Sequence, residues 1–338
     1  MIVMRCDGTA SIGLGHVGRC LALAEAIAEL GATCRFRGRF DSAATRMIAA
    51  AGFPIDHGPT AGSTDDRRTF QDWAPSARGI VVDSYSIDDN YLAELAEFRT
   101  SVMAIDDFAR LPRYPSDAVL NFTVGAPQRT YPSGPARLLL GPKYFLARRR
   151  LHAARLEARQ RIGPIRRLLV AMGGADPDDL STRIVESLVR LRVDTAVKVV
   201  TTVSHPNLAG LKTWSNAFPS GYEVMVQTPD LAELLSWADA CVCGGGLIKY
   251  EASYLAVPAA VISRTADETA ETEEFAGFGL AWDLQLTPSR MCPDALSERL
   301  TAFLNEGSRR AGISKAAFAA FPQDPARNAA QAYLELVN

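Results

Sequence analysis

One histidine stands where a glycine-containing loop leads into a helix pattern, and its surroundings suit acid–base chemistry. The stretch Arg5–Cys20 reads RCDGTASIGLGHVGRC and follows an apolar strand pattern at residues 1–4. Glycines such as Gly13 and Gly15 let the backbone bend sharply and let a ligand approach it closely. His16 carries the one side chain there whose unperturbed pKa lies near neutrality. The N–H groups of a helix start favour an anion, so we take His16 as the candidate catalytic base.

Two other interpretations of this loop stay open. In the first, His16 is a satisfied side chain in the first turn of a helix. In the second, three glycines form the G-x-G-x-x-G pattern of a dinucleotide site, and three arginines after the next strand pattern meet the phosphate of NADP. That fingerprint should follow its strand at once, whereas residues 6–12 intervene here, so it is weak evidence. The residues concerned are Gly13, Gly15, Gly18, Arg35, Arg37 and Arg39.

Polar side chains also fall at the carboxyl ends of predicted parallel strands, the edge where such sheets bind ligands. The apolar strand pattern Gly79–Asp83 leads into Tyr85, and the next strand is closed by Asp106 and Asp107. We expect these side chains to face the same crevice as His16. Adjacent residues at a strand end point apart, so we predict no metal site at the two aspartates.

Composition is that of a globular protein without a nucleic-acid partner. The 338 residues suffice for two domains, with 48% hydrophobic and 22% charged residues and a net charge of −2. No apolar run approaches the length of a membrane span and no signal-peptide pattern is present, so we expect a cytoplasmic protein without membrane insertion. The six cysteines form no C-x-x-C pair. Cys241 and Cys243 alternate within an apolar strand pattern and are expected core residues.

Strand patterns alternate with helix patterns in two successive series, which is typical of α/β proteins with parallel sheets. The first series predicts strands at 1–4, 33–36, 54–56, 79–83, 101–105, 118–121 and 138–140, helices from His16 and at 43–51 and 88–98, and a loop with one helical turn at 58–78. An arginine-rich segment at 147–167 follows, which we interpret as an exposed helix and linker. The second series predicts strands at 167–172, 196–201, 222–226, 238–243 and 259–263, and helices near Asp179, at Asp230–Trp237, around Glu251, at 267–274 and at 325–337.

Eight short stretches, in order from residue 5 to residue 251, carry a family resemblance. They are Arg5-Cys-Asp7-Gly8, Ile12-Gly-Leu-Gly-His16 with Arg19-Cys20, Val82-Asp83-Ser-Tyr85, Ile105-Asp106-Asp107, Leu120-Asn121, Leu140-Gly-Pro-Lys-Tyr144, Met172-Gly-Gly-Ala-Asp176-Pro177 and Gly244-Gly245. Together they resemble the UDP-sugar hydrolase of pseudaminic acid biosynthesis (the PseG type), a relative of glycosyltransferases such as MurG. The resemblance implies an α/β GT-B fold with two Rossmann-like domains facing a central cleft. It also implies a nucleotide held mainly by the C-terminal half, a sugar facing the N-terminal half, and His16 as general base on water.

The nucleotide half departs from the family pattern at two places. Gly-Ser-Thr is usual in the family where this chain has Gly245-Gly246-Leu247, so two hydroxyls are missing. An Asn-Gln pair is usual where this chain has Asp267-Glu268, and carboxylates beside a diphosphate add like-charge repulsion. Glu251 is retained where relatives hold the ribose hydroxyls.

We therefore expect a hydrolase of a nucleotide-diphosphate sugar, with His16 as base and Asp83 and Tyr85 positioning the sugar or the water. Helix N-termini after Gly174 and Gly246 would stabilise the leaving diphosphate. A GT-B glycosyltransferase using the same base on an acceptor hydroxyl, and a non-catalytic nucleotide-sugar binding protein, remain alternatives.

We place an N-terminal sugar and catalytic domain at 1–148, a nucleotide-binding domain at 149–322 and a C-terminal helix at 323–338. We expect a small-molecule nucleotide sugar as the partner, no cofactor, no metal, no nucleic acid, and a monomer or weak homodimer. The predicted binding residues are Arg5, Asp7, Gly13, Gly15, Asn121, Gly173, Gly174, Asp176, Gly245, Gly246, Glu251, Asp267 and Glu268.

Overall fold

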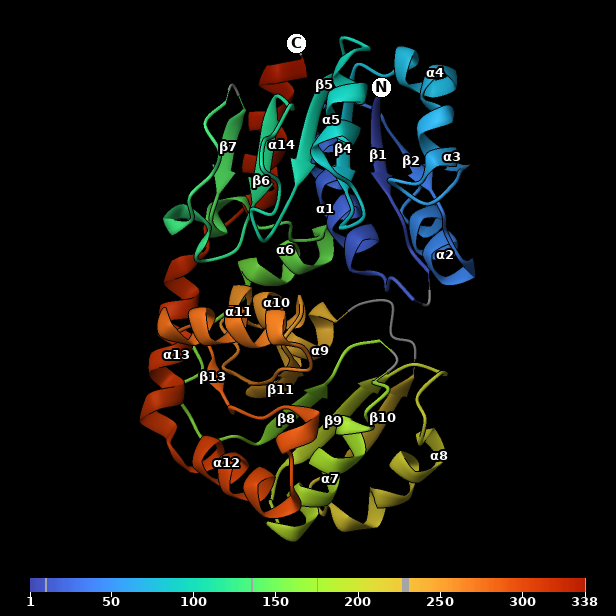
Figure 1. The fold of residues 1–338 in the computed structure, drawn as a ribbon. Coiled ribbons are helices and arrows are strands. Elements are labelled where there is room, and N and C mark those ends of the chain that lie inside the picture. Colours follow the sequence, from blue (N-terminus) through green and yellow to red (C-terminus); the bar gives the residue numbers. More distant parts are fainter. Residues whose placement is uncertain (10, 135, 175, 227–230, 338) are drawn as a thin grey trace. The chain divides into compact units, whose positions relative to one another are not determined.

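The chain folds into two compact units, each built on its own parallel sheet (Figure 1). The computed structural model describes residues 1–9, 11–134, 136–174, 176–226 and 231–337. The first unit comprises Met1–His152 with Pro322–Asn338, and the second comprises Ala153–Phe321.

The first unit contains a seven-stranded sheet in the order β3-β2-β1-β4-β5-β6-β7. Its strands are β1 (Ile2–Cys6), β2 (Cys34–Gly38), β3 (Ile55–His57), β4 (Gly79–Asp83), β5 (Ser101–Ile105), β6 (Ala118–Asn121) and β7 (Arg137–Leu140). All neighbouring strands are parallel. The central strands are apolar on both faces because helices cover both faces of such a sheet. The strands predicted for this half are confirmed, with small shifts at their ends.

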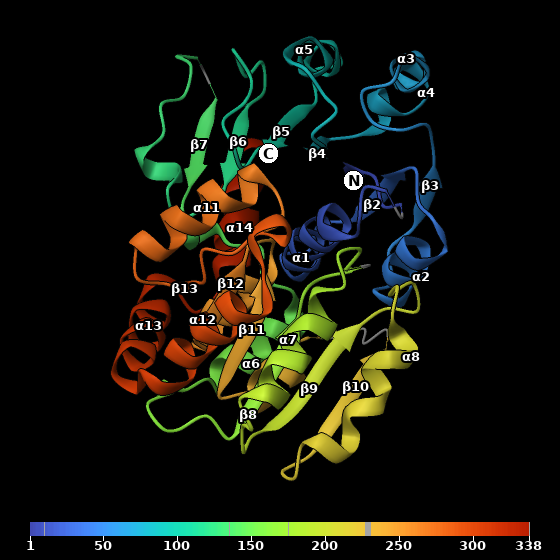
Figure 2. The ribbon, with the colours of Figure 1, turned by 60° about the horizontal axis from the view of Figure 1, so that its bottom comes forward.

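Helices cover both faces of this first sheet. They are α1 (Gly15–Glu29), α2 (Ser42–Ala50), α3 (Thr64–Arg68), α4 (Phe70–Trp73), α5 (Asp89–Ala96) and α14 (Pro325–Val337), with 3-10 turns at Ala74–Ser76, Ala126–Gln128 and Pro142–Tyr144. Helix α6 (Arg149–Leu156) contains the boundary between the two units, which falls between His152 and Ala153. Figure 2 shows α3, α4 and α5 over one face, and α1 and α14 over the other. The C-terminal helix therefore belongs to the core of the N-terminal unit.

Residues 58–78 contain more helix than the loop with one helical turn that their composition predicts. Ser63 caps α3 by accepting a hydrogen bond from the N–H of Asp66, and Phe70 and Trp73 of α4 are buried. Asp66 is itself fully buried and accepts a hydrogen bond from the Tyr91 hydroxyl at 2.7 Å. Burial of these side chains against distant parts of the chain therefore stabilises helices in a segment whose local composition is that of a loop.

The second unit contains a six-stranded parallel sheet in the order β10-β9-β8-β11-β12-β13. Its strands are β8 (Arg167–Ala171), β9 (Ala196–Thr201), β10 (Tyr222–Val226), β11 (Ala240–Gly244), β12 (Ala259–Ile262) and β13 (Trp282–Asp283). Its remaining helices are α7 (Leu180–Arg190), α8 (Leu208–Leu211), α9 (Ala232–Trp237), α10 (Ile248–Tyr254), α11 (Ala266–Gly277), α12 (Pro293–Asn305) and α13 (Gly307–Ala320), with 3-10 turns at Lys212–Ala217 and Pro288–Arg290. The predicted start of α9 at Asp230 lies outside the described residues. Helices α8, α12 and α13 and strand β13 are not predicted by the sequence patterns.

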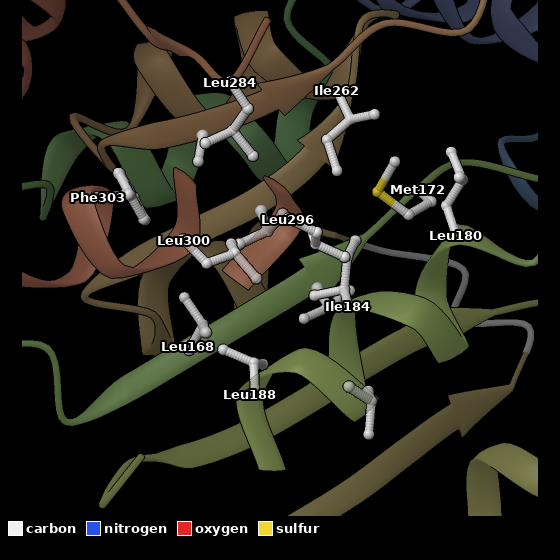
Figure 3. Packing of buried hydrophobic residues seen from close by; sticks show 14 of the residues in the cluster. Leu168, Met172, Leu180, Ile184, Leu188, Ile262, Leu284, Leu296, Leu300 and Phe303 are labelled. Carbon is white, nitrogen blue, oxygen red and sulfur yellow. The ribbon is translucent and has the colours of Figure 1, made fainter. Parts of the chain in front are cut away.

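Helices α7 and α12 cover one face of the second sheet and pack with it into a hydrophobic core (Figure 3). Ile184 of α7 and Leu300 of α12 are fully buried there with Leu168 of β8 and Ile262 of β12. Cys241 and Cys243 of β11 are also fully buried, which confirms their assignment to the core. This packing holds the strand ends from which the loops of the second unit emerge.

The arginine-rich segment is not simply an exposed face, which corrects the interpretation of residues 147–167. Arg155 is buried and donates hydrogen bonds to the carbonyl of Tyr254 at 2.6 Å and to that of Phe321 at 3.0 Å. Burial lowers the pKa of its guanidinium. Arg155 thus joins α6 to the C-terminal end of the second unit. In the described part of the chain, every helix is too short or too polar to cross a membrane.

The docking of α14 on the first sheet can be tested at Tyr333. Its ring is fully buried and its hydroxyl donates to the carbonyl of Ser101 at 2.7 Å. We expect Tyr333→Phe to lower the free energy of unfolding of this unit by about 1 kcal/mol, the net value of a hydrogen bond. Tyr333→Ala should lower it by about 3–5 kcal/mol because a cavity remains. The measurement is urea unfolding, with exposed Gln331→Ala as the control; unchanged stability of Tyr333→Ala would show that α14 is not part of this core.

Candidate active site

The loop between β1 and α1 delivers His16 to the carboxyl edge of the first sheet. Gly13 has a φ of +84°, a conformation that glycine adopts without strain, and its N–H donates to the carbonyl of Thr9 at 2.7 Å. α1 then begins at Gly15 with no side chain capping its first turn and no acidic residue in it. His16, in this first turn, is 7% exposed and is therefore not an ordinary surface histidine.

A carboxylate from β4 fixes the orientation of the His16 ring. Asp83 aligns with Cys6 in the β1–β4 register, so the two strands end side by side. Its Oδ1 lies 2.6 Å from Nδ1 of His16, and the carboxylate is fully buried. An ionised carboxylate only accepts hydrogen bonds, so Nδ1 carries the proton and Nε2 is left with its lone pair. That is the tautomer a general base needs.

Arg19 shares the same carboxylate. It lies one helical turn after His16, on the same face of α1. Its Nε donates to Asp83 Oδ2 at 3.0 Å and its Nη2 to Asp83 Oδ1 at 2.7 Å. Burial alone would raise the pKa of Asp83, but Arg19 and then His16 outweigh it and hold the pKa below its usual value. Burial would likewise lower the pKa of Arg19, but Asp107 and Asp83 raise it well above its ordinary value.

Asp107 completes the cluster from the end of β5. Its Oδ2 accepts hydrogen bonds from Nη1 of Arg19 and, at 2.8 Å, from the Tyr85 hydroxyl. Its Oδ1 is buried and has no hydrogen-bond partner. The Tyr85 ring lies edge-on to His16 with centroids 4.7 Å apart. Desolvation of the hydroxyl, and then the Asp107 carboxylate, raises the pKa of Tyr85, so the phenol stays protonated.

The structure therefore brings together His16, Asp83, Tyr85 and Asp107, which were expected to share one crevice, and adds Arg19. Arg19 was part of a matching stretch but had no predicted role; its position three residues after His16 was the available signal. Asp106, in contrast, turns away and accepts from the N–H groups of Phe108 and Arg110 and from the Tyr114 hydroxyl. Across the described residues, no three His, Cys, Asp or Glu side chains are grouped as a metal ion requires.

Three predicted binding residues of this unit are occupied by internal contacts. Arg5 is fully buried, with its Nη2 2.9 Å from Asp66 Oδ1. Asp7 is 2% exposed and accepts from the N–H groups of Arg39 and Ala61, each at 2.8 Å. These contacts brace the neighbouring loops against β1.

Asn121, at the end of β6, is likewise fully buried and engaged within the unit. Its Nδ2 donates to the Tyr131 hydroxyl at 2.9 Å, and its Oδ1 accepts from the Thr123 hydroxyl at 2.7 Å. Two arginines considered for NADP are engaged as well. Arg35 pairs with Asp56 at 3.0 Å, and Arg37 donates to the Thr69 hydroxyl at 3.1 Å.

In the second unit, the carboxylate of Asp176 caps the N-terminus of α7. Asp176 is 1% exposed and accepts from the N–H groups of Leu180 at 3.0 Å and Ser181 at 2.8 Å. Asp176 therefore already binds the first two amides of the helix start that was expected to receive the leaving diphosphate, and its negative charge counts against that prediction. Gly173 has a φ of +95°, and a Cβ at either Gly173 or Gly174 would meet open space.

The two acidic residues that depart from the family pattern lie in different surroundings. Asp267 is exposed at the start of α11. Glu268 packs against Gly245, where a Cβ would come within 3.1 Å of its Oε2. Arg264 compensates the charge of Glu268 through its backbone N–H at 2.8 Å and its Nη2 at 2.9 Å.

Helix α10, which follows Gly246, holds a lysine that sequence reasoning missed. Lys249 is fully buried, and its Nζ binds the Gly245 carbonyl and lies 3.1 Å from Glu271 Oε2. A Cβ at Gly246 would meet open space, and Glu251 is half-buried on the same helix. The lysine therefore anchors the glycine loop to α11.

The depressed pKa of Asp83 makes stability depend on pH in a defined direction. A carboxylate with a lower pKa in the folded state stabilises that state fully above the unfolded pKa of about 3.9, and this contribution is lost as pH falls below that value toward the folded pKa. We expect the gap in unfolding free energy between the wild type and Asp83→Asn to stay constant from pH 7 to about pH 5 and to shrink below about pH 4. Urea unfolding at several pH values measures it; exposed Asp267→Asn should show no such trend. A gap that widens toward acid would contradict the ionised Asp83.

Comparison with known proteins shows distant relatives and a well-populated fold. No family model matches the chain. Over 182 residues, or 53% of the chain, it is 32% identical to the spore coat polysaccharide biosynthesis protein SpsG of Bacillus subtilis. Over 270 residues, or 77% of the chain, it is 22% identical to the uncharacterized protein MJ1062 of Methanocaldococcus jannaschii. The matches cover 52% and 55% of those proteins, so the chain spans about half their length.

Among solved structures, MurG of Acinetobacter baumannii aligns over 99% of both chains, with a TM-score of 0.62 and 16% identity. LpCGTa in complex with UDP aligns over 99% of this chain and 98% of its own, with a TM-score of 0.64 and 13% identity. Identity at this level establishes architecture alone. The two units are Rossmann-like, and the chain has the GT-B fold.

Proposed function

We propose that this chain hydrolyses the glycosidic C–O bond of a nucleotide-diphosphate sugar, with His16 as general base on water. The observation that carries the proposal is the His16 Nδ1 contact with Asp83 at 2.6 Å, which leaves Nε2 free to take a proton. The uncapped start of α1 beside it supplies N–H groups for a polar ligand. Water attack at the anomeric carbon needs a positioned base of this kind and no covalent nucleophile.

The chemistry around His16 suits the sugar end of such a substrate. The unpartnered Oδ1 of Asp107 is a buried acceptor, and leaving it unsatisfied costs about 1–3 kcal/mol. A sugar hydroxyl or amide N–H would satisfy it. Tyr85 is 44% exposed, with its ring edge-on to the imidazole. The unsatisfied acceptor favours a neutral, donor-bearing sugar over a phosphate.

We assign the nucleotide to the second unit, with UDP as the first choice. LpCGTa, which shares the fold, is in complex with UDP, and SpsG is named for polysaccharide biosynthesis. The open glycines at 173, 174 and 246 allow close approach to the backbone. Compensation of Glu268 by Arg264 lowers the like-charge repulsion that the sequence alone suggested.

A glycosyltransferase is the second candidate, because apolar side chains flank the catalytic loop. Ile12 and Leu14 are each 40% exposed on either side of Gly13. An apolar acceptor would bury them, and His16 would then deprotonate the acceptor hydroxyl in place of water. Release of free sugar without any acceptor distinguishes hydrolysis from transfer.

Turnover in water labelled with heavy oxygen tests the proposed reaction. UDP, CMP, GDP and dTDP compounds, and UDP-linked acetamido-deoxy sugars, are first ranked by thermal shift, since a bound ligand raises the melting temperature. With a sugar that is turned over, we expect the label in the free sugar, none in UDP, and inverted configuration at the anomeric carbon. His16→Ala should lose turnover by about 10²-fold or more, the usual contribution of a general base, while UDP-sugar affinity stays within a few-fold. Label in UDP, or near-normal turnover by His16→Ala, would refute the mechanism.

Glu268 provides a separate test of the nucleotide site. If its carboxylate lies beside a diphosphate, Glu268→Gln should tighten UDP binding and the gain should shrink with added salt. Asp267→Asn is the matched control, because that carboxylate is exposed and should change affinity little. Titration calorimetry with UDP measures both. Equal effects of the two changes would place the phosphates away from Gly245.

A further inference from the structure

We propose that Arg19 is a positioning residue that keeps His16 in its base form, by neutralising Asp83 so that this carboxylate orients the imidazole without charging it. The role of Arg19 in catalysis rests on the proposed function. The arrangement of charges around His16 is independent of that function, and it can be measured on the protein without a substrate.

The contacts of Arg19 are those of a fixed bridge between two carboxylates. One edge of its guanidinium binds both oxygens of Asp83, at 3.0 and 2.7 Å, and Nη1 binds Asp107. The guanidinium carbon lies 5.9 Å from the centroids of the Tyr85 and Phe122 rings. The side chain is 6% exposed, so water screens these charges weakly. Planar two-point binding of this kind is specific to arginine.

The bridge changes what Asp83 does to His16. A buried carboxylate alone, 2.6 Å from an imidazole, would favour the imidazolium strongly. Arginine does not lose its proton, so Arg19 supplies a permanent positive charge that balances Asp83. The carboxylate keeps its geometric role, because Oδ1 still accepts from Nδ1 of His16. Its electrostatic pull on a proton at the ring is largely cancelled.

Among the other groups around the ring, Asp107 adds a second negative charge from beyond Arg19, where its Oδ2 binds the guanidinium and the protonated Tyr85 hydroxyl. Cys20, with Sγ 4.0 Å from Asp83 Oδ2, stays a neutral thiol because burial, and then Cys6, raises its pKa. The guanidinium carbon of Arg110 lies 5.2 Å from the centroid of the Tyr85 ring.

A competing arrangement within the same cluster would reverse the conclusion. Nη2 of Arg19 is 2.9 Å from Nδ1 of His16 and would donate to it if Nδ1 carried no proton. Nδ1 and Asp83 Oδ1 would then face each other at 2.6 Å with lone pairs only. Two acceptors at that distance repel, whereas an Nδ1 proton makes a short charge-assisted hydrogen bond. The arrangement with Nδ1 protonated is therefore the one we assign.

Nitrogen NMR of the imidazole rings tests the bridge directly. The chain has four histidines, and His16→Ala identifies the His16 signals. In the wild type at neutral pH we expect a proton on Nδ1 and none on Nε2. In Arg19→Met the pH at which the ring gains its second proton should rise by about one unit or more, the usual effect of an uncompensated opposite charge. The acid limb of kcat/KM should move with it, with kcat lowered more than KM is changed.

Two further variants keep the test decisive. Arg19→Lys retains the charge but not the two-point contact, so its midpoint should fall between those of the wild type and Arg19→Met. Arg110→Met is the matched control, because Arg110 contacts neither Asp83 nor His16 and should leave the midpoint unchanged. A wild-type ring protonated on Nε2, or an unshifted midpoint in Arg19→Met, would overturn the inference. If Arg19→Met fails to fold, the protonated nitrogen of the wild-type ring still decides it. These results are independent of the labelled-water result, so either proposal can fail alone.

Discussion

A single buried carboxylate, that of Asp83, governs the arrangement of the first unit's site. A fully buried charge is strongly unfavourable unless it is paired and hydrogen-bonded. Pairing of β4 with β1 and β5 fixes Asp83 at the strand end, so its partners must come to it. α1 supplies both, because His16 and Arg19 lie one turn apart on the same face. The orientation of α1 and the tautomer of His16 follow from satisfying this one group.

Much of this arrangement could be predicted from local sequence. The run Gly79–Asp83 is apolar up to its last residue, and parallel strands bring their carboxyl ends to one edge. A polar residue closing such a strand therefore has to lie near the loop that follows β1. That reasoning placed Asp83, Tyr85 and His16 together, and the strand periodicity predicted both sheets.

What escaped prediction depends on contacts that no local pattern encodes. The role of Arg19 depends on its binding Asp83 and Asp107 at the same time, which its position in the helix pattern does not reveal. The segment around α3 is rich in polar residues and therefore resembles a loop. Its helices form because Asp66 is buried against Tyr91 and Arg5, which lie far away in the sequence. Asp176 read as part of a ligand loop, whereas its carboxylate caps the helix after it. In each case a polar residue consistent with ligand binding is used by a distant or neighbouring part of the fold.

The charge of the His16 cluster suits the course of the proposed reaction. Asp83 and Asp107 bring two negative charges and Arg19 one positive charge, so the cluster carries one net negative charge while His16 is neutral. A diphosphate beside it would be repelled, whereas a neutral sugar is not. When water gives its proton to Nε2, the imidazolium that forms brings the cluster to neutrality. Since this balance is built into fixed, buried side chains, it stabilises charge that develops in the transition state without reorganisation at the moment of reaction.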